Sequence, residues 1–428
     1  MTIAFFVLLA FLVLLFIGAP IAFAMGTAAL VGFLWTGGPY VLVQFPIVAY
    51  QMLDSSNFLA VPLFIMMGTI LFHGKVGADF FNLAGSFFGH YRAGAALATI
   101  SACAIFSAVS ASSLATAATI GALSVPAMLK QGYPKRLVYG PIAAGGTLGI
   151  LIPPSGVMIL YGAMTDVSIG SLFTAGFIPG LVLTVMLCLV AVFLTRGADV
   201  KPLPRASWPE RWESFKRSFW GILLPVIVLG GLYAGWFTAS EAGAIAVVLS
   251  LIVTMLIKKT ITLRTLPPIL IEGTKTSGFL FAVIVASGLF NHLMTELGVI
   301  QTITEFVVGT GANKITILLM ISALLFVMGM FFEVAALVLV MVPILFPVIT
   351  ALGIDPIWFG IFFVVNIEFA YLTPPVGMNL FIIQEIGRRY TPTGFDDVVK
   401  STLPYILCHC MMLVILLLFP QIATFLVR

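Results

Sequence analysis

The sequence predicts an all-α integral membrane protein built of two related halves. Two observations carry this prediction. Hydrophobic residues occupy 61% of the 428 positions and charged residues only 8%, and a set of landmark residues returns at one fixed spacing. A soluble domain usually carries about 25% charged residues, so 8% cannot supply a polar surface. The composition excludes an ordinary soluble enzyme, a disordered chain and a secreted disulfide scaffold.

Several apolar runs approach the roughly 20 residues that a helix needs to cross a bilayer. They are Thr2–Ile17, Phe173–Leu194, Gly221–Trp236 and Met411–Val427. The short alternating segments of a membrane barrel are not seen in the sequence. The first run resembles a signal peptide, with Ala22–Ala24 as a cleavage site. No cation precedes it, because the first one is Lys75, so we expect a retained helix.

The hydrophilic segments are short and mostly basic. The longest, Arg196–Ser218, holds six cations and three acids, and the positive-inside rule places it in the cytoplasm. Lys130–Arg136 and Lys258–Arg264 are assigned to the same side. The net charge is only +4, and no basic patch interleaves with aromatic residues, so we expect the lipid bilayer and not nucleic acid as a partner.

An internal repeat links the two halves. Landmarks of the first half return 221 positions later: Ser56 at Ser277, Gly77 at Gly298, Pro126 at Pro347, and Pro153-Pro154 with Gly156 at Pro374-Pro375 with Gly377. Chance similarity among apolar residues does not explain one offset over so long a stretch. The halves are therefore 1–207 and 208–428, and such repeats are typical of secondary transporters.

The segment 106–126 has the length of a membrane helix but carries seven hydroxyl side chains. One interpretation is a helix packed through small residues, with the hydroxyls bonded to the preceding turn. The other is a re-entrant hairpin whose tip, near Ser110–Ser113, presents hydroxyls to an ion. This segment alone leaves both open.

Pro-Pro pairs interrupt two apolar helices at matching positions of the halves. Proline has no N–H, so each pair deprives the carbonyls four residues earlier of their helical donors. These carbonyls belong to Gly149, Ile150, Ala370 and Tyr371. Orphaned carbonyls in hydrocarbon need protein, water or an ion, and a hard cation such as sodium prefers oxygen ligands. A kink that neighbouring side chains re-satisfy is the alternative, but paired breaks favour a central ion site.

Glu333 lies in an otherwise apolar run and aligns with Ser112 of the first half. An acid within a membrane segment is a functional hypothesis by default, as ion ligand or proton carrier. A helix cap or an interhelical hydrogen bond is the alternative, and the same holds for Glu241 and Glu368. The four cysteines are expected to be core residues, and the four histidines show no metal-binding spacing.

The runs Ser110–Gly121, Gly146–Ser155 and Leu372–Asn379 resemble the large membrane subunit of TRAP transporters, the tripartite ATP-independent periplasmic transporters of bacteria and archaea. The resemblance covers essentially the whole chain. It implies two inverted repeats, each with a re-entrant helical hairpin and a broken transmembrane helix, arranged as a scaffold and an elevator-type transport domain. The implied hairpins are about 105–129 and 328–349, and the implied broken helices are about 139–165 and 358–387.

The resemblance also implies a function. It implies sodium-coupled uptake of an organic acid anion, such as a dicarboxylate or a sialic acid, across the bacterial inner membrane. The implied partners are a small membrane subunit of about four helices and a periplasmic binding protein that delivers the substrate. Sodium would be the coupling ion and not a prosthetic group.

The residues that the resemblance implies for the site fall into two overlapping sets. The substrate-binding set is Ser112, Ser113, Ser155, Glu333 and Asn379. The sodium set is Ser110, Ser112, Gly149, Ile150, Pro153, Glu333, Ala370, Thr373, Pro374 and Gly377. Half-helix N-termini favour an anion, while freed carbonyls and hydroxyls favour the cation. Because Phe331–Glu333 replaces hydroxyl residues in the second hairpin, the two ion sites should differ.

Three alternatives stay open at this point. A self-sufficient sodium and dicarboxylate symporter would work without a binding protein. A membrane-embedded enzyme would need a paired nucleophile and base or a metal cluster, and the sequence offers neither. A passive channel is disfavoured because paired broken helices suit alternating access better than an open pore.

Overall fold

The computed structural model describes residues 2–37 and 43–427 of the chain. Within these residues the secondary structure is helical, and nine helical stretches are long and apolar enough to cross a bilayer. The prediction of an all-α, multi-pass membrane protein is confirmed.

The helices of the first half are α1 (Thr2–Phe16), α2 (Ile21–Gly37), α3 (Gln44–Leu53), α4 (Ser56–His73), α5 (Val76–Phe88), α6 (Gly94–Ser110), α7 (Ser113–Lys130), α8 (Lys135–Leu151), α9 (Gly156–Thr165) and α10 (Ile169–Thr195). Those of the second half are α11 (Trp208–Tyr233), α12 (Ala239–Leu251), the π-helical segment η2 (Ile252–Ile257), α13 (Leu266–Glu296), α14 (Val299–Gly309), α15 (Lys314–Gly329), α16 (Val334–Ala351), α17 (Pro356–Tyr371), α18 (Met378–Arg388), α19 (Phe395–Leu418) and α20 (Gln421–Thr424).

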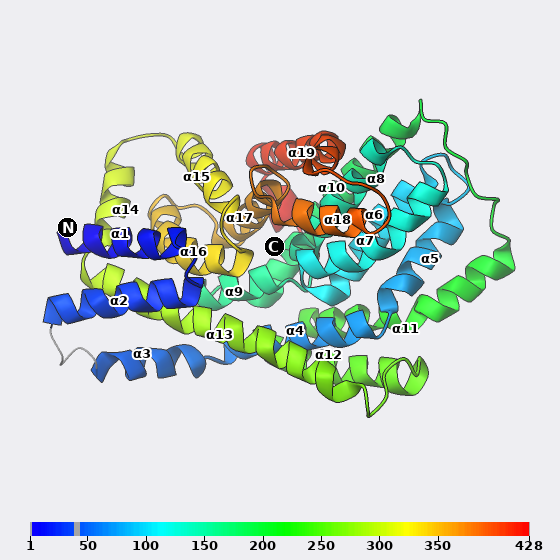
Figure 1. The fold of residues 1–428 in the computed structure, drawn as a ribbon. Helices are drawn as coiled ribbons and strands as arrows, with labels where there is room; N and C mark the ends of the chain where they lie inside the picture. The colour runs from blue at the N-terminus through cyan, green and yellow to red at the C-terminus, as the bar shows by residue number, and fades with distance from the viewer. Residues whose placement is uncertain (1, 38–42, 428) are drawn as a thin grey trace.

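Each half contains a helical hairpin. In the first, α6 and α7 join at residues 111–112, and in the second, α15 and α16 join at residues 330–333. Figure 1 shows the first hairpin reaching the middle of the molecule from the end where α5 and α11 lie. The second hairpin reaches it from the end where α14 lies, so the two hairpins have inverted orientations.

The hairpins are longer than the sequence predicted. They span Gly94–Lys130 and Lys314–Ala351, against the expected 105–129 and 328–349. The expected ranges miss most of each first arm, α6 and α15. Both arms consist of small or apolar residues without an internal proline or charge, so they give the same pattern as an ordinary membrane helix. The turn itself coincides with the expected tip near Ser110–Ser113.

Each half also contains a broken helix after its hairpin. The first consists of α8 and α9, separated by residues 152–155, and the second consists of α17 and α18, separated by residues 372–377. The breaks contain the two Pro-Pro pairs, each of which has a cis peptide bond. The broken helices begin at Lys135 and Pro356, a few residues before the expected 139 and 358.

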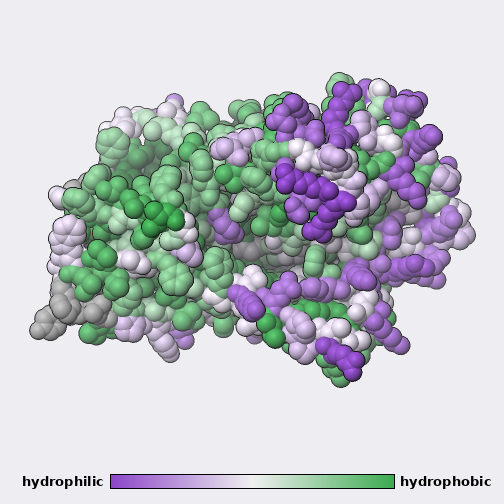
Figure 2. Space-filling view, in the orientation of Figure 1, coloured by the Kyte–Doolittle hydropathy of each residue, from purple (hydrophilic) through white to green (hydrophobic). Residues whose placement is uncertain are grey.

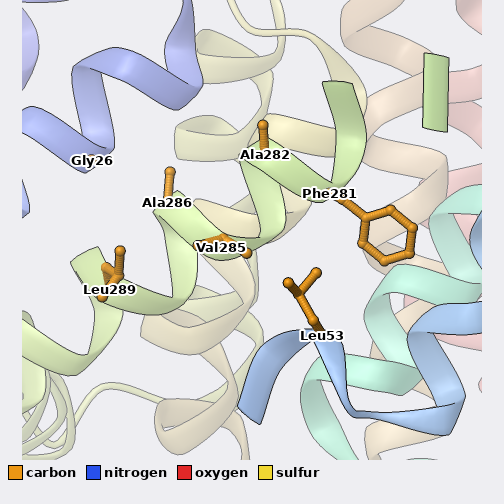
Figure 3. A pocket seen from close by; sticks show the side chains of 7 residues that line it. All are labelled: Gly26, Leu53, Phe281, Ala282, Val285, Ala286 and Leu289. Carbon is orange, nitrogen blue, oxygen red and sulfur yellow. The ribbon is translucent and has the colours of Figure 1, made fainter. Parts of the chain in front are cut away.

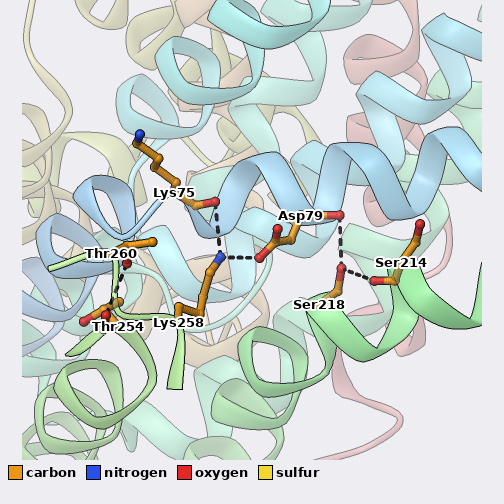
Figure 4. Close-up of polar contacts among 7 residues, drawn as sticks. All are labelled: Lys75, Asp79, Ser214, Ser218, Thr254, Lys258 and Thr260. Atoms are coloured by element: carbon orange, nitrogen blue, oxygen red, sulfur yellow. Dashed lines mark hydrogen bonds and ion pairs between the residues drawn. The ribbon is translucent and has the colours of Figure 1, made fainter. Parts of the chain in front are cut away.

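The longest helix, α13, packs against α2, α3, α4 and α16 and runs the length of one side of the molecule (Figure 1). At its start, polar contacts join neighbouring helices (Figure 4). Lys258 forms an ion pair with Asp79 of α5 and donates to the carbonyl of Lys75 at 3.4 Å. Ser218 of α11 donates to the carbonyl of Asp79 at 3.0 Å. These contacts hold α11 and η2 against α5.

The polar surface is confined mainly to one end of the molecule. Figure 2 shows hydrophilic residues gathered at the end that carries α5, α11 and α18, while the other part of the visible face is largely hydrophobic. The basic segment Arg196–Ser218 lies at this hydrophilic end, as do the C-terminal end of α7 and the start of α8. By the positive-inside rule, we expect this end to face the cytoplasm.

Candidate functional site

The tip of the first hairpin is shaped by a left-handed residue and a helix cap. Ala111 has a φ of 53° and ends α6, and Ser112 caps α7 by accepting a hydrogen bond from the amide of Ala115 at 3.4 Å. The hydroxyls of Ser110 and Thr116 lie 2.6 Å apart, and that of Ser110 also lies 3.2 Å from the carbonyl of Ser112. The turn therefore concentrates hydroxyl and carbonyl oxygens, the ligand type that a hard cation prefers.

The first break lies directly against this tip. The amide of Gly156 donates to the carbonyl of Ala111 at 3.3 Å, so one backbone bond joins the break to the hairpin. A Cβ on Gly149 would lie 2.5 Å from the carbonyl oxygen of Ser112. Only glycine permits this approach of α8 to the tip. Ser112, Gly149 and the first break are therefore neighbours, as the predicted sodium set requires.

The second break reaches the first hairpin through Asn379. Its side chain is fully buried in the first turn of α18. Its Nδ2 donates to the hydroxyl of Ser113 at 2.9 Å and to the carbonyl of Ala143 at 3.1 Å. Gly377, with a φ of 57°, turns the chain into α18. The structure thus brings together Ser113 and Asn379, two of the predicted substrate-binding residues.

The tip of the second hairpin has a different chemistry. Glu333 caps α16, because its Oε2 accepts from the amides of Ala335 at 2.9 Å and Ala336 at 3.3 Å. The amide of Val334 donates to the hydroxyl of Tyr371 at 2.9 Å, which joins this tip to the end of α17. Capping was the structural alternative for Glu333. Its assignment to the substrate and to sodium stays a prediction.

The freed carbonyls are better satisfied than the sequence suggested. The carbonyl of Ile150 accepts from the hydroxyl of Ser155 at 2.6 Å, and that of Ala370 accepts from the amide of Thr373 at 3.0 Å. These two bonds agree with the alternative of a kink whose freed carbonyls are satisfied by neighbouring groups, because Ser155 and Thr373 fold back after the helix ends. The carbonyl of Ile150 has two lone pairs, and Ser155 occupies one of them.

Three further residues of this region are not in either predicted site set, although the sequence singled out Glu368 and the carbonyl of Tyr371. Thr116 and Tyr371 contact the two tips, as described above. Glu368 of α17 is fully buried, and neither carboxylate oxygen has a hydrogen-bond partner within the described part of the chain. An acid in a membrane segment was the available signal for Glu368. The partners of the Thr116 and Tyr371 side chains depend on the folded structure and have no signal in the sequence.

A separate groove of about 430 Å³ lies between α2, the end of α3 and α13. Figure 3 shows its lining of apolar side chains, among them Leu53, Phe281 and Val285. It offers no polar group to orient an organic acid. The candidate site is therefore the region where both hairpin tips and both breaks meet, which we call the central site.

Comparison with known proteins agrees with this architecture. Residues 8–422 match the model of the DctM component of the tripartite ATP-independent periplasmic transporters. The chain belongs to this family. The TRAP large permease DctM for C4-dicarboxylates of Rhodobacter capsulatus is 37% identical, over 96% of this chain and 95% of that one. Both the family and the helices indicate a multi-pass protein of the inner membrane.

Other TRAP permeases are nearly as similar. The sialic acid TRAP permease SiaT of Haemophilus influenzae is 34% identical, over 98% of this chain and 67% of the longer relative. The ectoine TRAP large permease TeaC of Halomonas elongata is 32% identical, over 96% of both chains. The solved structure of the Alcanivorax borkumensis YdaH transporter, described as having an unusual topology, shares the fold with a TM-score of 0.55 and 13% identity, over 91% of this chain and 90% of that one.

Proposed function

We propose that this TRAP large permease carries an organic acid anion into the cell together with sodium. The observation that carries the proposal is the bond between Ser113 and Asn379, which ties the first hairpin tip to the second broken helix. Oxygen ligands and helix N-termini from both repeats thereby converge on one region. Broken helices in matching positions of two repeats are the usual location of a transporter's substrate and ion sites.

The central site suits both cargoes. The helices α7, α9 and α18 begin there, and helix N-termini favour anions through their free N–H groups. Hydroxyl and carbonyl oxygens of the first tip and first break fit sodium, with Ser110, Ser112, Gly149 and Ile150 as ligands. At the second break, Ala370, Thr373 and Gly377 would offer carbonyl oxygens. Placing substrate and sodium side by side makes the binding of each favour the other.

The elevator motion is the second part of the proposal. The hairpins and broken helices form the moving unit, and α13 belongs to the scaffold. Pro343 in α16 cannot donate to the carbonyl of Leu339, and α13 supplies replacement donors. Ser287 donates to it at 2.6 Å and Asn291 at 3.1 Å. These bonds cross from scaffold to moving unit, so an elevator step must break them.

The family supports a three-part assembly. A small membrane subunit would extend the scaffold, and a periplasmic binding protein would deliver the substrate. The relatives are named for C4-dicarboxylates, sialic acid and ectoine, at 32–37% identity. We propose the C4-dicarboxylates first, because the relative that is 37% identical over nearly the whole of both chains is named for them.

The test is uptake into proteoliposomes that contain this chain with its small subunit. The binding protein is loaded with labelled C4-dicarboxylate, and in parallel with sialic acid or ectoine. We expect uptake under an inward sodium gradient and none under a matched potassium gradient. Uptake that ignores sodium contradicts the coupling. Uptake by this chain alone, without a binding protein, identifies the self-sufficient symporter instead.

A further inference from the structure

A second pocket, away from the central site, lies between α5, α6 and α11. It has a volume of about 430 Å³, and Arg205, Arg211 and His90 lie in its wall. The chain preceding α11 is held across it, because the amide of Leu203 donates to the carbonyl of Gly89 at 3.0 Å. The rest of the lining is mainly apolar and aromatic, and Ser101 and Tyr91 add hydroxyl groups. The pocket is therefore cationic on one wall and apolar on the others.

The basic groups of this pocket are not neutralised by acids. Nε of Arg211 is buried and has no hydrogen-bond partner, and the same is true of Nδ1 of His90. The Arg211 guanidinium lies 5.3 Å from the ring centre of Phe87, which positions it without satisfying its N–H groups. Neither Arg205 nor Arg211 forms an ion pair with any residue that the structure describes. A buried, unpartnered guanidinium N–H is costly unless an anion accepts from it.

The nearest acids on α11 are already engaged. Glu210 caps the helix, accepting from the amide of Ser207 at 2.6 Å and from its hydroxyl at 2.8 Å. Glu213 forms an ion pair with Arg217 one turn later. No acid lines the pocket. The arrangement keeps two arginines and one histidine available for an external anion.

Exposed aromatic side chains indicate that the pocket lies near the membrane surface. Three exposed tryptophans lie on α11, which forms one wall, and an exposed tyrosine lines the pocket; such residues gather where the bilayer meets water. They are Tyr91, Trp208, Trp212 and Trp220. The pocket also belongs to the hydrophilic end of the molecule (Figure 2), which the positive-inside rule assigns to the cytoplasm. At this level the abundant anions are lipid phosphates, and basic pockets between membrane helices bind such headgroups.

We propose that this pocket binds the phosphate group of an anionic phospholipid from the cytoplasmic leaflet. Arg211 and Arg205 hold the phosphate by charge-assisted hydrogen bonds, and His90 adds a third polar contact. The acyl chains lie along the apolar wall that includes Leu83 and Ile105. A bound lipid would fasten α11 to α5, a pair that is otherwise joined in part by the bond from Ser218. The proposal does not depend on the transported substrate.

The test compares lipid binding and stability of the full-length chain in nanodiscs. One set contains neutral phosphatidylcholine only, and the other contains phosphatidylcholine with phosphatidylglycerol. For the parent chain we expect phosphatidylglycerol to raise the melting temperature and to stay bound in native mass spectrometry. Arg211→Gln should weaken this binding about tenfold or more, because it removes a hydrogen bond between charged groups. Arg205→Gln, at an exposed position, should weaken it about fivefold.

Lys216→Gln is the matched control, since Lys216 lies on the same helix but outside the pocket. It should keep the effect of phosphatidylglycerol almost intact. Equal losses in Lys216→Gln and Arg211→Gln would mean that the general basic surface attracts the lipid, which overturns the proposal. If Arg211→Gln fails to fold, Arg205→Gln still decides between these outcomes.

A third arm distinguishes a lipid from a soluble anion. The delipidated chain in neutral detergent is heated with inorganic phosphate or with chloride at equal ionic strength and equal sodium. We expect little stabilisation by inorganic phosphate, since it cannot occupy the apolar wall. Full stabilisation by inorganic phosphate, lost in Arg211→Gln, would show a soluble phosphate site and would overturn the lipid assignment. Equal retention of phosphatidylcholine and phosphatidylglycerol by the parent chain would also overturn it.

Discussion

The two hairpins of this TRAP permease pack against their surroundings through different sets of contacts. Apart from the hydrogen bond between Ser113 and Asn379, the first contacts its surroundings through close backbone approaches that glycine permits. Gly149 of α8 faces the carbonyl of Ser112, and Gly68 of α4 would place a Cβ only 2.7 Å from the carbonyl of Ser110. The second meets its surroundings through side chains, with Tyr371 bonded to Val334 and α13 bonded to Leu339.

The repeat alignment makes the difference specific. Residue 370 is the counterpart of residue 149. In the second half the broken helix α17 carries alanine at this position, and the glycine lies on the hairpin instead. A Cβ on Gly329 of α15 would lie 2.7 Å from the Cβ of Ala370. Residues 112 and 333 are also counterparts, and both cap the second arm of their hairpin, one with a hydroxyl and one with a carboxylate. Close approach and capping are common to both halves, while charge and hydrogen bonding differ.

This difference separates a fixed element from an adjustable one. Close contacts between backbones cannot be released by turning a side chain, so the first tip and first break behave as one rigid body. A phenol, a serine and an asparagine can change partners at a cost of about 1 kcal/mol for each hydrogen bond. We therefore expect the first hairpin to define the site and the second to respond to it.

The largest expected effect comes from filling the closest contact of the first half. Gly149→Val forces a side chain against the carbonyl of Ser112, and overpacking of this kind costs about 3 kcal/mol. Thermal unfolding should show the loss of stability, and uptake should disappear. Gly278→Ala is the control, because a Cβ there meets nothing within 4 Å, and it should be neutral or slightly stabilising. Equal behaviour of the two variants would show that the first tip is not rigid.

The next effect concerns the bond that joins the halves. Asn379→Leu leaves the buried hydroxyl of Ser113 and the carbonyl of Ala143 without their shared donor, at a cost of about 2 kcal/mol. Ser113→Ala removes only one side of this contact. In the double variant the losses should fall short of the sum by about 1 kcal/mol, as measured by chemical unfolding. Strictly additive losses would mean that the two side chains do not interact, and that this bond does not couple the first tip to the second break.

Much of this architecture can be predicted from the sequence. The two Pro-Pro pairs predict the positions of both breaks, because such a pair cannot continue a helix, and the repeat offset relates one pair to the other. The turn at Ala111 and Ser112 falls within the hydroxyl-rich tip, because Ser is a preferred helix cap. These features follow from backbone chemistry over a few residues, which is why no tertiary information was needed.

What the sequence could not supply are contacts between distant segments. The bond between Ser113 and Asn379 joins residues 266 positions apart, and no local sequence pattern predicts it. The donors from Ser155 and Thr373 to the freed carbonyls depend on how the chain folds after each break. The arms α6 and α15 were missed or shortened because an apolar re-entrant arm and an apolar spanning helix have the same composition. The roles of the predicted ligands remain predictions, because a role in binding depends on contacts between distant segments.

A smaller effect is expected when the charge at the second tip is removed but the helix cap is kept. Glu333→Ser gives the second hairpin the residue type that caps the first, so stability should change by less than about 1 kcal/mol. If the carboxylate is a sodium ligand, the sodium concentration for half-maximal uptake should rise about fivefold or more, since even a well-screened unit charge near a cation contributes about 1 kcal/mol. Glu305→Ser, on the exposed face of α14, is the control. An unchanged sodium dependence would leave Glu333 as a cap alone.

The smallest effect tests whether the second hairpin moves against the scaffold. Ser287→Ala removes one donor to the carbonyl of Leu339, while Asn291 keeps the other, so stability should fall by only about 1 kcal/mol. Ser277→Ala is matched to it, because Ser277 lies on the same helix and its hydroxyl bonds within that helix, to Gly273 at 2.8 Å.

If α16 slides along α13, the bond from Ser287 exists in only one transport state, and its loss should shift the balance between states about fivefold. The shift can be measured in a background without native cysteines that carries Phe331→Cys at the exposed second tip. An impermeant thiol reagent is added on one side of the membrane or on the other, and the readout is the ratio of the two labelling rates. Ser277→Ala should leave that ratio unchanged. An identical ratio in both variants would mean that α13 and α16 keep the same contact throughout the cycle, and the moving boundary would then have to lie elsewhere than at the second hairpin.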